Sequence, residues 1–398
     1  MMRIIYWNNI PAPYVIDRFN ALARRGKYDF EAWFSGRTKD DRSWAVDESK
    51  WIFPYRYLPA VGKGAYPFAI PTPLLRGEAP DLFVSLYAAP TFLLGWALAR
   101  ARGARTAFWV EVTHEAWVRR RRWKEALKTK IFPQVDAVLT PGEDGRKFAL
   151  GYGAKADRIL CVPHVIDVEH FAEARSMTLM ERERVRASLG LRGVTFVYVG
   201  RLWAGKGVAN LIDAFAKLQD EAAGDPETTL LLVGDGVDEE RLRRYAAETT
   251  EGRVVFGGFR DSEALPKVYG ASDVFVFPTL GDPYGLVINE AMAAGLPVIS
   301  TTAAGEIRQR IRSGKNGFLV EPARADQLAA RMLALARDPD LRRRLGLAAA
   351  ADVAGKTPEL WAEAFEQATA KILSMPPVGL SRSRRRLRAR GTTQSTLK

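Results

Sequence analysis

The sequence predicts an α/β fold built from two doubly wound domains. Apolar runs with strand character alternate with helix-forming segments, as a parallel doubly wound sheet requires. The chain of 398 residues exceeds what one hydrophobic core usually serves and fits two domains of about 180 residues each. Glycine turns follow two of the apolar runs, at positions where a strand hands over to a helix.

The first half of the chain supplies much of this alternation. Met2–Trp7 has the pattern of a first strand, and the loop of residues 8–14 precedes a predicted helix, Val15–Arg25. Further strands are predicted at Leu82–Leu86, Thr106–Val112, Ala137–Thr140 and Ile159–Val162, with helices at Thr91–Ala101 and Trp123–Phe132. We expect these elements to form a first domain of residues 1–175. The single Cys161 excludes an intramolecular disulfide, and its place in a strand predicts a core position.

Two cations follow the apolar strand Phe196–Val199. Arg201 and Lys206 lie in a glycine-rich turn that begins at Gly200. A strand-to-helix junction directs backbone N–H groups and the positive end of a helix dipole toward a bound anion. The planar fork of an arginine and the point charge of a lysine together suit a diphosphate. Solvated charges in a surface loop are the alternative interpretation of both residues.

Two carboxylates bracket the start of a predicted helix, Leu286–Ala294, which follows the strand Val274–Phe277. Asp282 precedes this helix and Glu290 lies within its apolar sequence. Burial of an unpaired charge is costly, so a pair of ligand hydroxyls explains Glu290 better than solvation does. A lysine or arginine elsewhere in the core is the alternative partner for Glu290, and a loop or helix-cap role is the alternative for Asp282.

Further motifs follow in a fixed order along the second half. They are Leu230–Gly236, Val254–Phe259, Leu265–Asp273, Gly295–Ser300, Gly305–Ile307 and Asn316–Val320. Together with the turn at Gly200–Gly207 and the segment Asp282–Glu290, this ordered set resembles the retaining family 4 glycosyltransferases. The resemblance implies the GT-B fold, in which two Rossmann-like domains face a central cleft.

The resemblance also implies roles for individual residues. The donor-binding set would comprise Gly200, Arg201 and Lys206 at the diphosphate, Glu290 at the ribose hydroxyls, and the backbone of Tyr284, Gly285, Leu286 and Val287 near the transferred sugar and phosphate. Asp282 falls where the family's E-x7-E pattern usually has its first glutamate. Because aspartate is one methylene shorter, a sugar-facing catalytic role there would have altered donor preference or geometry, or would be weakened.

His114 is the second catalytic candidate. It follows the strand predicted to end at Val112, at the edge where open α/β sheets bind ligands. An imidazole at this edge would contact the acceptor or the transferred sugar, as in relatives that have a histidine in this neighbourhood. A polar loop histidine without a chemical role is the alternative.

The resemblance divides the remainder of the chain. We expect a nucleotide-sugar-binding domain over residues 176–355 and a helix over residues 356–374 that crosses back to the first domain. A basic tail over residues 375–398, rich in arginine, is expected to be disordered.

The net charge of +13 is unevenly distributed. The basic residues Arg119, Arg120, Arg121 and Arg122 are followed by Trp123, Lys124 and Lys128. A helix of this composition suits an anionic membrane surface, with basic groups at the headgroups and aromatic rings among them. The alternative is a charged outer face whose apolar stripe packs on the sheet.

The predicted activity is transfer of a sugar from a nucleotide-diphosphate sugar to an acceptor hydroxyl, on a lipid-linked or envelope polysaccharide intermediate, and the family resemblance implies that the transfer is retaining. No cofactor or metal is expected, since the cations would neutralise the diphosphate. The alternatives are a nucleotide-sugar epimerase, a silent nucleotide-sugar binder and, because the pI is about 9.8, a nucleic-acid-binding protein. No nucleic-acid-binding motif accompanies the charge. We expect a cytoplasmic location that includes the inner face of the membrane, because neither a secretory signal nor a membrane-spanning run is present.

Overall fold

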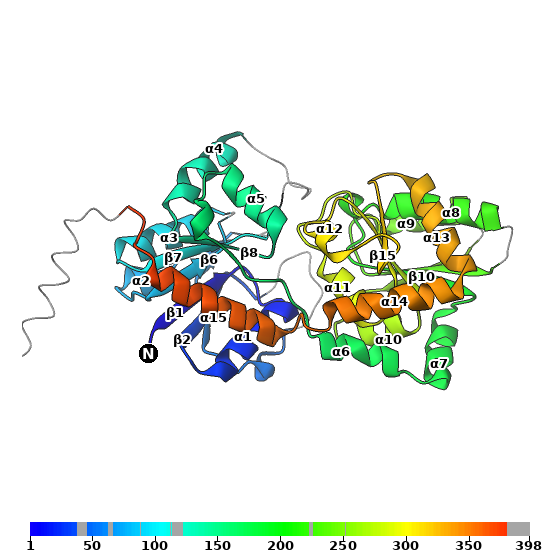
Figure 1. Ribbon diagram of the computed structural model, residues 1–398, viewed down its shortest axis with the longest axis horizontal. Coiled ribbons are helices and arrows are strands. Elements are labelled where there is room, and N and C mark those ends of the chain that lie inside the picture. The colour runs from blue at the N-terminus through cyan, green and yellow to red at the C-terminus, as the bar shows by residue number, and fades with distance from the viewer. Residues whose placement is uncertain are drawn as a thin grey trace, which may run out of the picture.

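The structure is a computed structural model with two lobes, each built on its own parallel sheet (Figure 1). It describes residues 1–37, 46–62, 67–87, 89–111, 113, 122–222, 226–250 and 252–379. Residues 380–398 of the predicted tail lie outside this part of the chain, as do His114, Arg119, Arg120 and Arg121. The first residues of the predicted tail are ordered against the first domain, because Arg158 donates to the carbonyl of Pro376 at 2.8 Å and the N–H of Val378 donates to Asp136 at 2.8 Å.

The first domain contains a seven-stranded parallel sheet of order β3-β2-β1-β6-β7-β8-β9. Its strands are β1 (Arg3–Asn8), β2 (Asp29–Phe34), β3 (Tyr55–Tyr57), β6 (Leu82–Ser85), β7 (Arg105–Trp109), β8 (Ala137–Thr140) and β9 (Ile159–Cys161), with a small hairpin of β4 (Ala60–Val61) and β5 (Phe68–Ala69). Its helices are α1 (Pro13–Arg25), α2 (Thr72–Leu75), α3 (Pro90–Ala101), α4 (Arg122–Ile131) and α5 (Glu143–Gly151).

The second domain contains a six-stranded parallel sheet of order β12-β11-β10-β13-β14-β15. Its strands are β10 (Val194–Val199), β11 (Thr228–Val233), β12 (Val254–Gly258), β13 (Val274–Phe277), β14 (Val298–Thr301) and β15 (Gly317–Val320). Its helices are α6 (Val168–Ala172), α7 (Leu179–Leu189), α8 (Val208–Ala222), α9 (Glu239–Thr249), α10 (Leu265–Gly270), α11 (Leu286–Ala293), α12 (Ile307–Arg310), α13 (Ala325–Arg337) and α14 (Pro339–Val353). Counted along the chain, this is the doubly wound order 3-2-1-4-5-6.

Both predicted doubly wound sheets are therefore confirmed. The crossing between the domains begins directly after β9, because Ile166, Val168 and Phe171 already pack in the core of the second domain. The second core thus starts before the boundary expected at residue 175. Cys161 is exposed, so the expected core position is wrong; it is the last residue of β9, which is the edge strand of its sheet.

The last helix, α15 (Pro358–Ser374), returns to the first domain and lies beside α1 (Figure 1). Its apolar face buries Trp361, Phe365 and Ile372 in the core of that domain. The ring of Trp361 stacks on Phe365, with centroids 4.9 Å apart, and packs against Tyr6 and Phe19. The two domains are thus joined by two chain crossings, one at residues 162–167 and one at residues 354–357.

We predict that Trp361→Ala lowers the free energy of unfolding by about 3–5 kcal/mol, since it removes a fully buried aromatic ring. The matched control is Leu360→Ala on the same helix, where the side chain is 37% exposed and the expected loss is below about 1 kcal/mol. Chemical denaturation followed by circular dichroism measures both. Equal losses would contradict the docking of α15 in the first core.

Candidate functional site

The site lies where the winding of the second sheet reverses direction. β10 and β13 are neighbours in the sheet, but their chains lead to opposite edges. The loops that follow them, residues 200–207 and 278–285, therefore meet at the carboxyl end of the sheet. Open α/β sheets bind ligands at such a switch point. Both of the segments singled out in the sequence lie here.

Glycines let the loop after β10 approach its neighbours closely. Gly200 has a φ of 154°, and a Cβ at Gly234 would lie 1.9 Å from the carbonyl oxygen of Gly200. At Gly207, with a φ of 68°, a Cβ would lie 2.1 Å from the carbonyl oxygen of Pro278. Glycine at position 234 therefore lets the loop after β11 pack against the loop after β10, and glycine at position 207 lets the loop after β10 pack against the loop after β13. The Tyr198 hydroxyl fixes the turn by donating to the carbonyl of Arg201 at 2.8 Å.

Lys206 and Asp282 form an ion pair that joins the two loops. Asp282 is 7% exposed, and its other carboxylate oxygen accepts a hydrogen bond from the backbone N–H of Tyr284 at 2.9 Å. Burial opposes ionisation of Asp282, but the ammonium group and the hydrogen bonds together lower its pKa below the ordinary value. Asp282 is therefore an anion that holds Lys206 and starts the turn into α11.

Arg310 holds the same turn in place through hydrogen bonds to backbone carbonyls. Its guanidinium donates to the carbonyls of Tyr284, Gly285 at 3.1 Å and Gly305 at 3.0 Å, and it also lies 4.0 Å from the centre of the Tyr284 ring. The sequence analysis missed this residue. Arg308 and Arg312 flank it in the chain, and nothing in the local sequence distinguishes the one arginine that is buried.

The turn leads into α11, whose first residues face the site. Gly285 adopts a left-handed conformation with a φ of 73° at the N-cap, where a Cβ would lie 2.9 Å from the Phe277 ring. About one turn into the helix is Glu290, which accepts a hydrogen bond from the Tyr269 hydroxyl at 2.9 Å. Burial raises the pKa of Glu290 to about 7, although the bond from Tyr269 acts in the opposite direction.

A cavity of about 230 Å³ opens in front of these elements and between the two domains. The second domain contributes Gly200, Arg201, Val287 and Glu290, with the segment around Phe259. In the described part of the chain, Lys206, Asp282, Tyr284, Gly285 and Leu286 are not among the lining residues. They lie beside the cavity and fix the loops that form its wall. The predicted donor-binding residues are thus of two kinds: some line the cavity, and the others support the loops that line it.

The first domain completes the cavity with the start of α1. Tyr14 and Asp17 line it opposite Glu290, as does Asp167 from the interdomain crossing. Burial raises the pKa of Asp17 to about 6, with the nearby Asp167 carboxylate adding to the shift. Sequence analysis placed the loop before α1 in the fold but did not identify Asp17, because one acid on an amphipathic helix resembles any surface charge.

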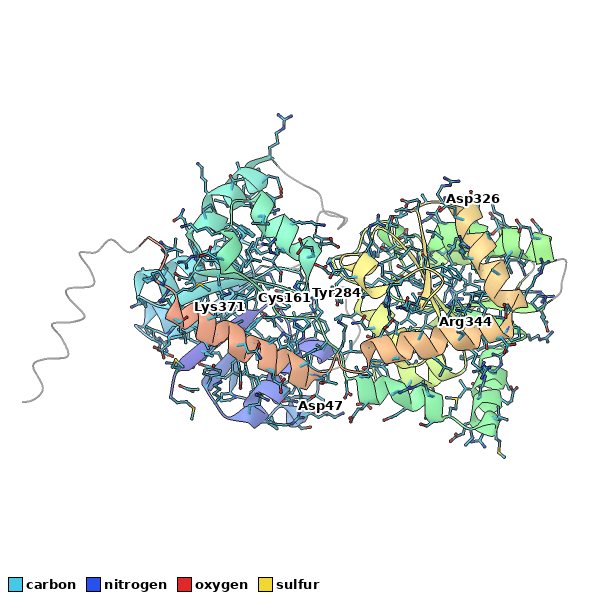
Figure 2. The ribbon with its side chains drawn as sticks, in the orientation of Figure 1. Asp47, Cys161, Tyr284, Asp326, Arg344 and Lys371 are labelled. Atoms are coloured by element: carbon cyan, nitrogen blue, oxygen red, sulfur yellow. The ribbon has the colours of Figure 1, made fainter. Side chains whose placement is uncertain are left out.

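Further contacts between the domains surround the site. The ring of His164 lies 4.5 Å from that of Tyr284, and Figure 2 shows Tyr284 between the lobes. Glu306 accepts a hydrogen bond from the N–H of Gly145 at 2.9 Å and so caps α5 of the first domain. The predicted catalytic His114 lies outside the described residues, although the preceding Thr113 is buried close to Gly305.

The second domain matches a known family. Residues 193–338 match the family model described as glycosyl transferases group 1. The second domain belongs to this family. The group 1 match contains every predicted donor-binding residue from Gly200 to Glu290.

Two curated relatives extend the match beyond this domain. The D-inositol 3-phosphate glycosyltransferase of Nocardia farcinica is 32% identical over 251 residues, which cover 61% of this chain and 53% of that protein. The mannosylfructose-phosphate synthase of Agrobacterium fabrum is 30% identical over 191 residues, which cover 46% of this chain and 40% of that protein. The chain thus spans about half the length of these relatives.

Solved structures share the fold of both domains. HepE of Anabaena in complex with UDP and glucose has a TM-score of 0.74 and 18% identity, covering 94% of this chain and 100% of that one. The sucrose-phosphate synthase from Thermosynechococcus elongatus also has a TM-score of 0.74, with 21% identity and the same coverages. The group 1 domain and its partner therefore form the GT-B fold expected from the sequence.

We predict that Glu290→Gln stabilises the protein at about pH 8 and has little effect at about pH 5. The pKa of the carboxyl is raised in the folded state to about 7, so the folded protein binds the proton more tightly than the unfolded chain does. Stability is lost as the pH rises from the unfolded value of about 4.5 through about 7, and glutamine abolishes that loss.

Thermal denaturation across this pH range measures the effect. Glu240→Gln, at an exposed position on α9, is the matched control and should leave the pH profile of the wild type unchanged. If the melting temperature of Glu290→Gln changed with pH in the same way as that of the wild type, the raised pKa of the buried Glu290 carboxyl would be contradicted.

Proposed function

We propose that the protein is a retaining glycosyltransferase that moves a sugar from a nucleotide-diphosphate sugar to an acceptor hydroxyl. The observation that supports this most strongly is the cavity at the switch point. It combines the cation of Arg201, the first turn of α11 at Val287 and the carboxylate of Glu290 in its lining, to which the first domain also contributes. A diphosphate needs the first two groups, and a ribose needs the third.

The donor would lie with its nucleoside against Glu290 and its diphosphate against Arg201. The Glu290 carboxylate would accept hydrogen bonds from the two ribose hydroxyls, which favours its ionised form. The guanidinium of Arg201 and the first N–H groups of α11 would hold the phosphate oxygens and stabilise the charge that develops as the diphosphate leaves. The first domain, packed across the cavity, would exclude water from the reacting bond.

Departure of the diphosphate without a metal ion stays part of the proposal. In the part of the chain that the structure describes, no group of three or more His, Cys, Asp or Glu side chains is arranged to hold a metal. Asp282 forms an ion pair with Lys206. For the Asp282 carboxylate to have the proposed catalytic role, both members of this pair would have to face the transferred sugar. The catalytic role of His114 likewise stays a proposal.

The names of the relatives, and the ligands bound in one solved structure, support the proposal. HepE was solved with UDP and glucose, and the two curated relatives are named as a D-inositol 3-phosphate glycosyltransferase and as a mannosylfructose-phosphate synthase. Another relative, 36% identical over 148 residues, is the lipopolysaccharide core biosynthesis glycosyltransferase LpsE of Rhizobium meliloti. An envelope glycan or its lipid-linked precursor is therefore the acceptor class we propose.

Thermal shift tests the donor site. We predict that one nucleoside diphosphate among UDP, GDP, ADP and TDP raises the melting temperature, and that Arg201→Ala weakens its binding by about 10- to 100-fold, because a charge-assisted hydrogen bond contributes about 1.5–3 kcal/mol. The control Arg244→Ala changes an exposed arginine on α9 and should bind like the wild type.

If the nucleoside diphosphate raised the melting temperature of Arg201→Ala as much as that of the wild type, the diphosphate would not bind at Arg201. Incubation with the corresponding nucleotide sugar and an acceptor then tests the reaction. Donor isomerisation without an acceptor product would indicate the epimerase, and binding without any turnover would indicate the silent binder.

We further propose that α4 contacts an anionic membrane at the cytoplasmic face. Trp123 is 56% exposed and Leu127 is 36% exposed on a helix that also carries Lys124 and Lys130. The ammonium of Lys124 lies 5.5 Å from the centre of the Trp123 ring, so the basic and aromatic groups share one surface. None of the described helices is long and apolar enough to cross a bilayer.

Co-sedimentation with vesicles that contain phosphatidylglycerol tests this contact. We predict that the double variant Trp123→Ala/Lys124→Glu loses most of its vesicle binding, because it removes the aromatic anchor and reverses a charge. The control Leu347→Ala removes an exposed apolar side chain from α14 of the second domain and should bind like the wild type. Equal binding by both variants would exclude α4 as the contact.

A further inference from the structure

A carboxylate of the second domain is buried against a helix of the first. Glu306 is 3% exposed, and its Oε1 accepts a hydrogen bond from the N–H of Gly145, in the first turn of α5, at 2.9 Å. In return, the N–H of Glu306 donates to the Asp144 carboxylate of the same turn at 2.8 Å. The other oxygen of Glu306 accepts a hydrogen bond from Gln309 at 2.7 Å. The two domains are therefore joined here by a reciprocal pair of hydrogen bonds.

The first domain has room for this carboxylate because residue 142 is a glycine. Gly142 is the N-cap of α5, and a Cβ at this position would lie 2.5 Å from Oε2 of Glu306 and 2.6 Å from its Cδ. The φ of Gly142 is −179°, which is an extended conformation that any residue adopts. The backbone itself therefore does not require glycine, and the missing side chain serves the approach of Glu306.

The backbone of Glu306 is strained. Its φ of 55° and ψ of 14° lie in the left-handed region, which residues other than glycine rarely adopt. Such a conformation persists only where the surrounding contacts hold it. Contacts on both sides do so, because Asp144 accepts from the N–H of Glu306 and Arg310 donates to the carbonyl of the preceding Gly305 at 3.0 Å. The place of Glu306 is thus set by its partners rather than by local preference.

The loop that carries Glu306 is hydrogen-bonded to the backbone of Asp282. The N–H of Asp282 donates to the carbonyl of Ala303, and the N–H of Gly305 donates to the carbonyl of Asp282, both at 3.0 Å. A Cβ at Gly305 would lie 2.0 Å from the carbonyl oxygen of Pro283, so the loop and the turn are in direct contact. A displacement of Glu306 is therefore transmitted to the turn that begins at Asp282.

We propose that Glu306 is a positioning residue that couples the docking of the first domain to the place of Asp282 in the donor site. When the domains pack together, the N-terminus of α5 binds the carboxylate, and the loop of residues 303–306 holds the turn in the arrangement described above. Separation of the domains would remove the bond from Glu306 to Asp144 that supports the left-handed backbone, and the loop would relax.

The consequence for catalysis rests on the proposed transferase function, whereas the coupling itself does not. Asp282 and its partner Lys206 would adopt the reactive arrangement only when the domains are closed. Closure also excludes water from the donor, so this coupling would limit cleavage of the donor by water in an open form.

Hydrogen–deuterium exchange of the full chain without ligand tests the coupling. Glu306→Ala removes the carboxylate, and Gly142→Ala displaces it from the side of the other domain. We expect either substitution to speed exchange at the amides of Asp282, Tyr284 and Gly305 by about tenfold, the equivalent of one hydrogen bond to a charged group. The double variant should show no larger effect than either single variant, because both substitutions break the same contact.

Glu263→Gln is the matched control, because it breaks an exposed ion pair between the domains, to Lys50 at 2.9 Å, and should leave exchange at these amides unchanged. Glu306→Gln keeps an acceptor oxygen for the same N–H group and should restore most of the protection. Three outcomes would overturn the proposal: unchanged exchange in either Glu306→Ala or Gly142→Ala, additive effects in the double variant, or equal exchange in Glu306→Gln and Glu306→Ala.

Turnover separates this inference from the proposed function. The assay measures nucleoside diphosphate released from UDP-, GDP-, ADP- or TDP-glucose. Glu306→Ala should lower kcat by about tenfold and keep the KM of the wild type, because Arg201 and Glu290 lie on other elements and line the cavity directly. A raised KM with an unchanged kcat would overturn the positioning role. If the wild type turned over none of these donors, the proposed function would lose its support, and the exchange experiment would still decide the coupling.

Discussion

The buried ion pair between Lys206 and Asp282 is the contact on which the geometry of the site depends. It joins the loop after β10 to the loop after β13, across the switch point of the sheet. Each charge is compensated by the other in a place that water hardly reaches, so removal of either partner would leave a buried charge unpaired. With Asp282 fixed, the turn at Gly285 points the start of α11 and Val287 into the cavity.

The first domain uses the same turn as its docking surface. His164, from the first crossing between the domains, packs on the ring of Tyr284, and burial together with Arg18 and Arg310 lowers the pKa of that imidazole well below its ordinary value. A neutral ring at this contact avoids placing another charge beside Arg310. The donor cavity is thus closed by a contact that depends on the loop that Lys206 and Arg310 hold in place.

Much of the fold was predictable from the sequence, because buried parallel strands are continuous apolar runs and the turns that follow them need glycine. β8 and β13 agree with the prediction at both ends, whereas β7 ends at Trp109, three residues before the expected end. β2 and β3 were not identified. For the site, residues adjacent in sequence such as Gly200 and Arg201 were found. Arg310 and Asp17 were not, because their roles depend on burial and on a second domain that only the folded chain brings near.

Hydrogen–deuterium exchange with and without a bound nucleoside diphosphate tests the central claim most directly. The account places the diphosphate at the loops after β10 and β13. It predicts that slowed exchange on binding is concentrated in the backbone amides of residues 200–207 and 284–290, with a smaller effect at the start of α1. Protection confined to other parts of the chain, with these two segments unchanged, would contradict the placement of the site.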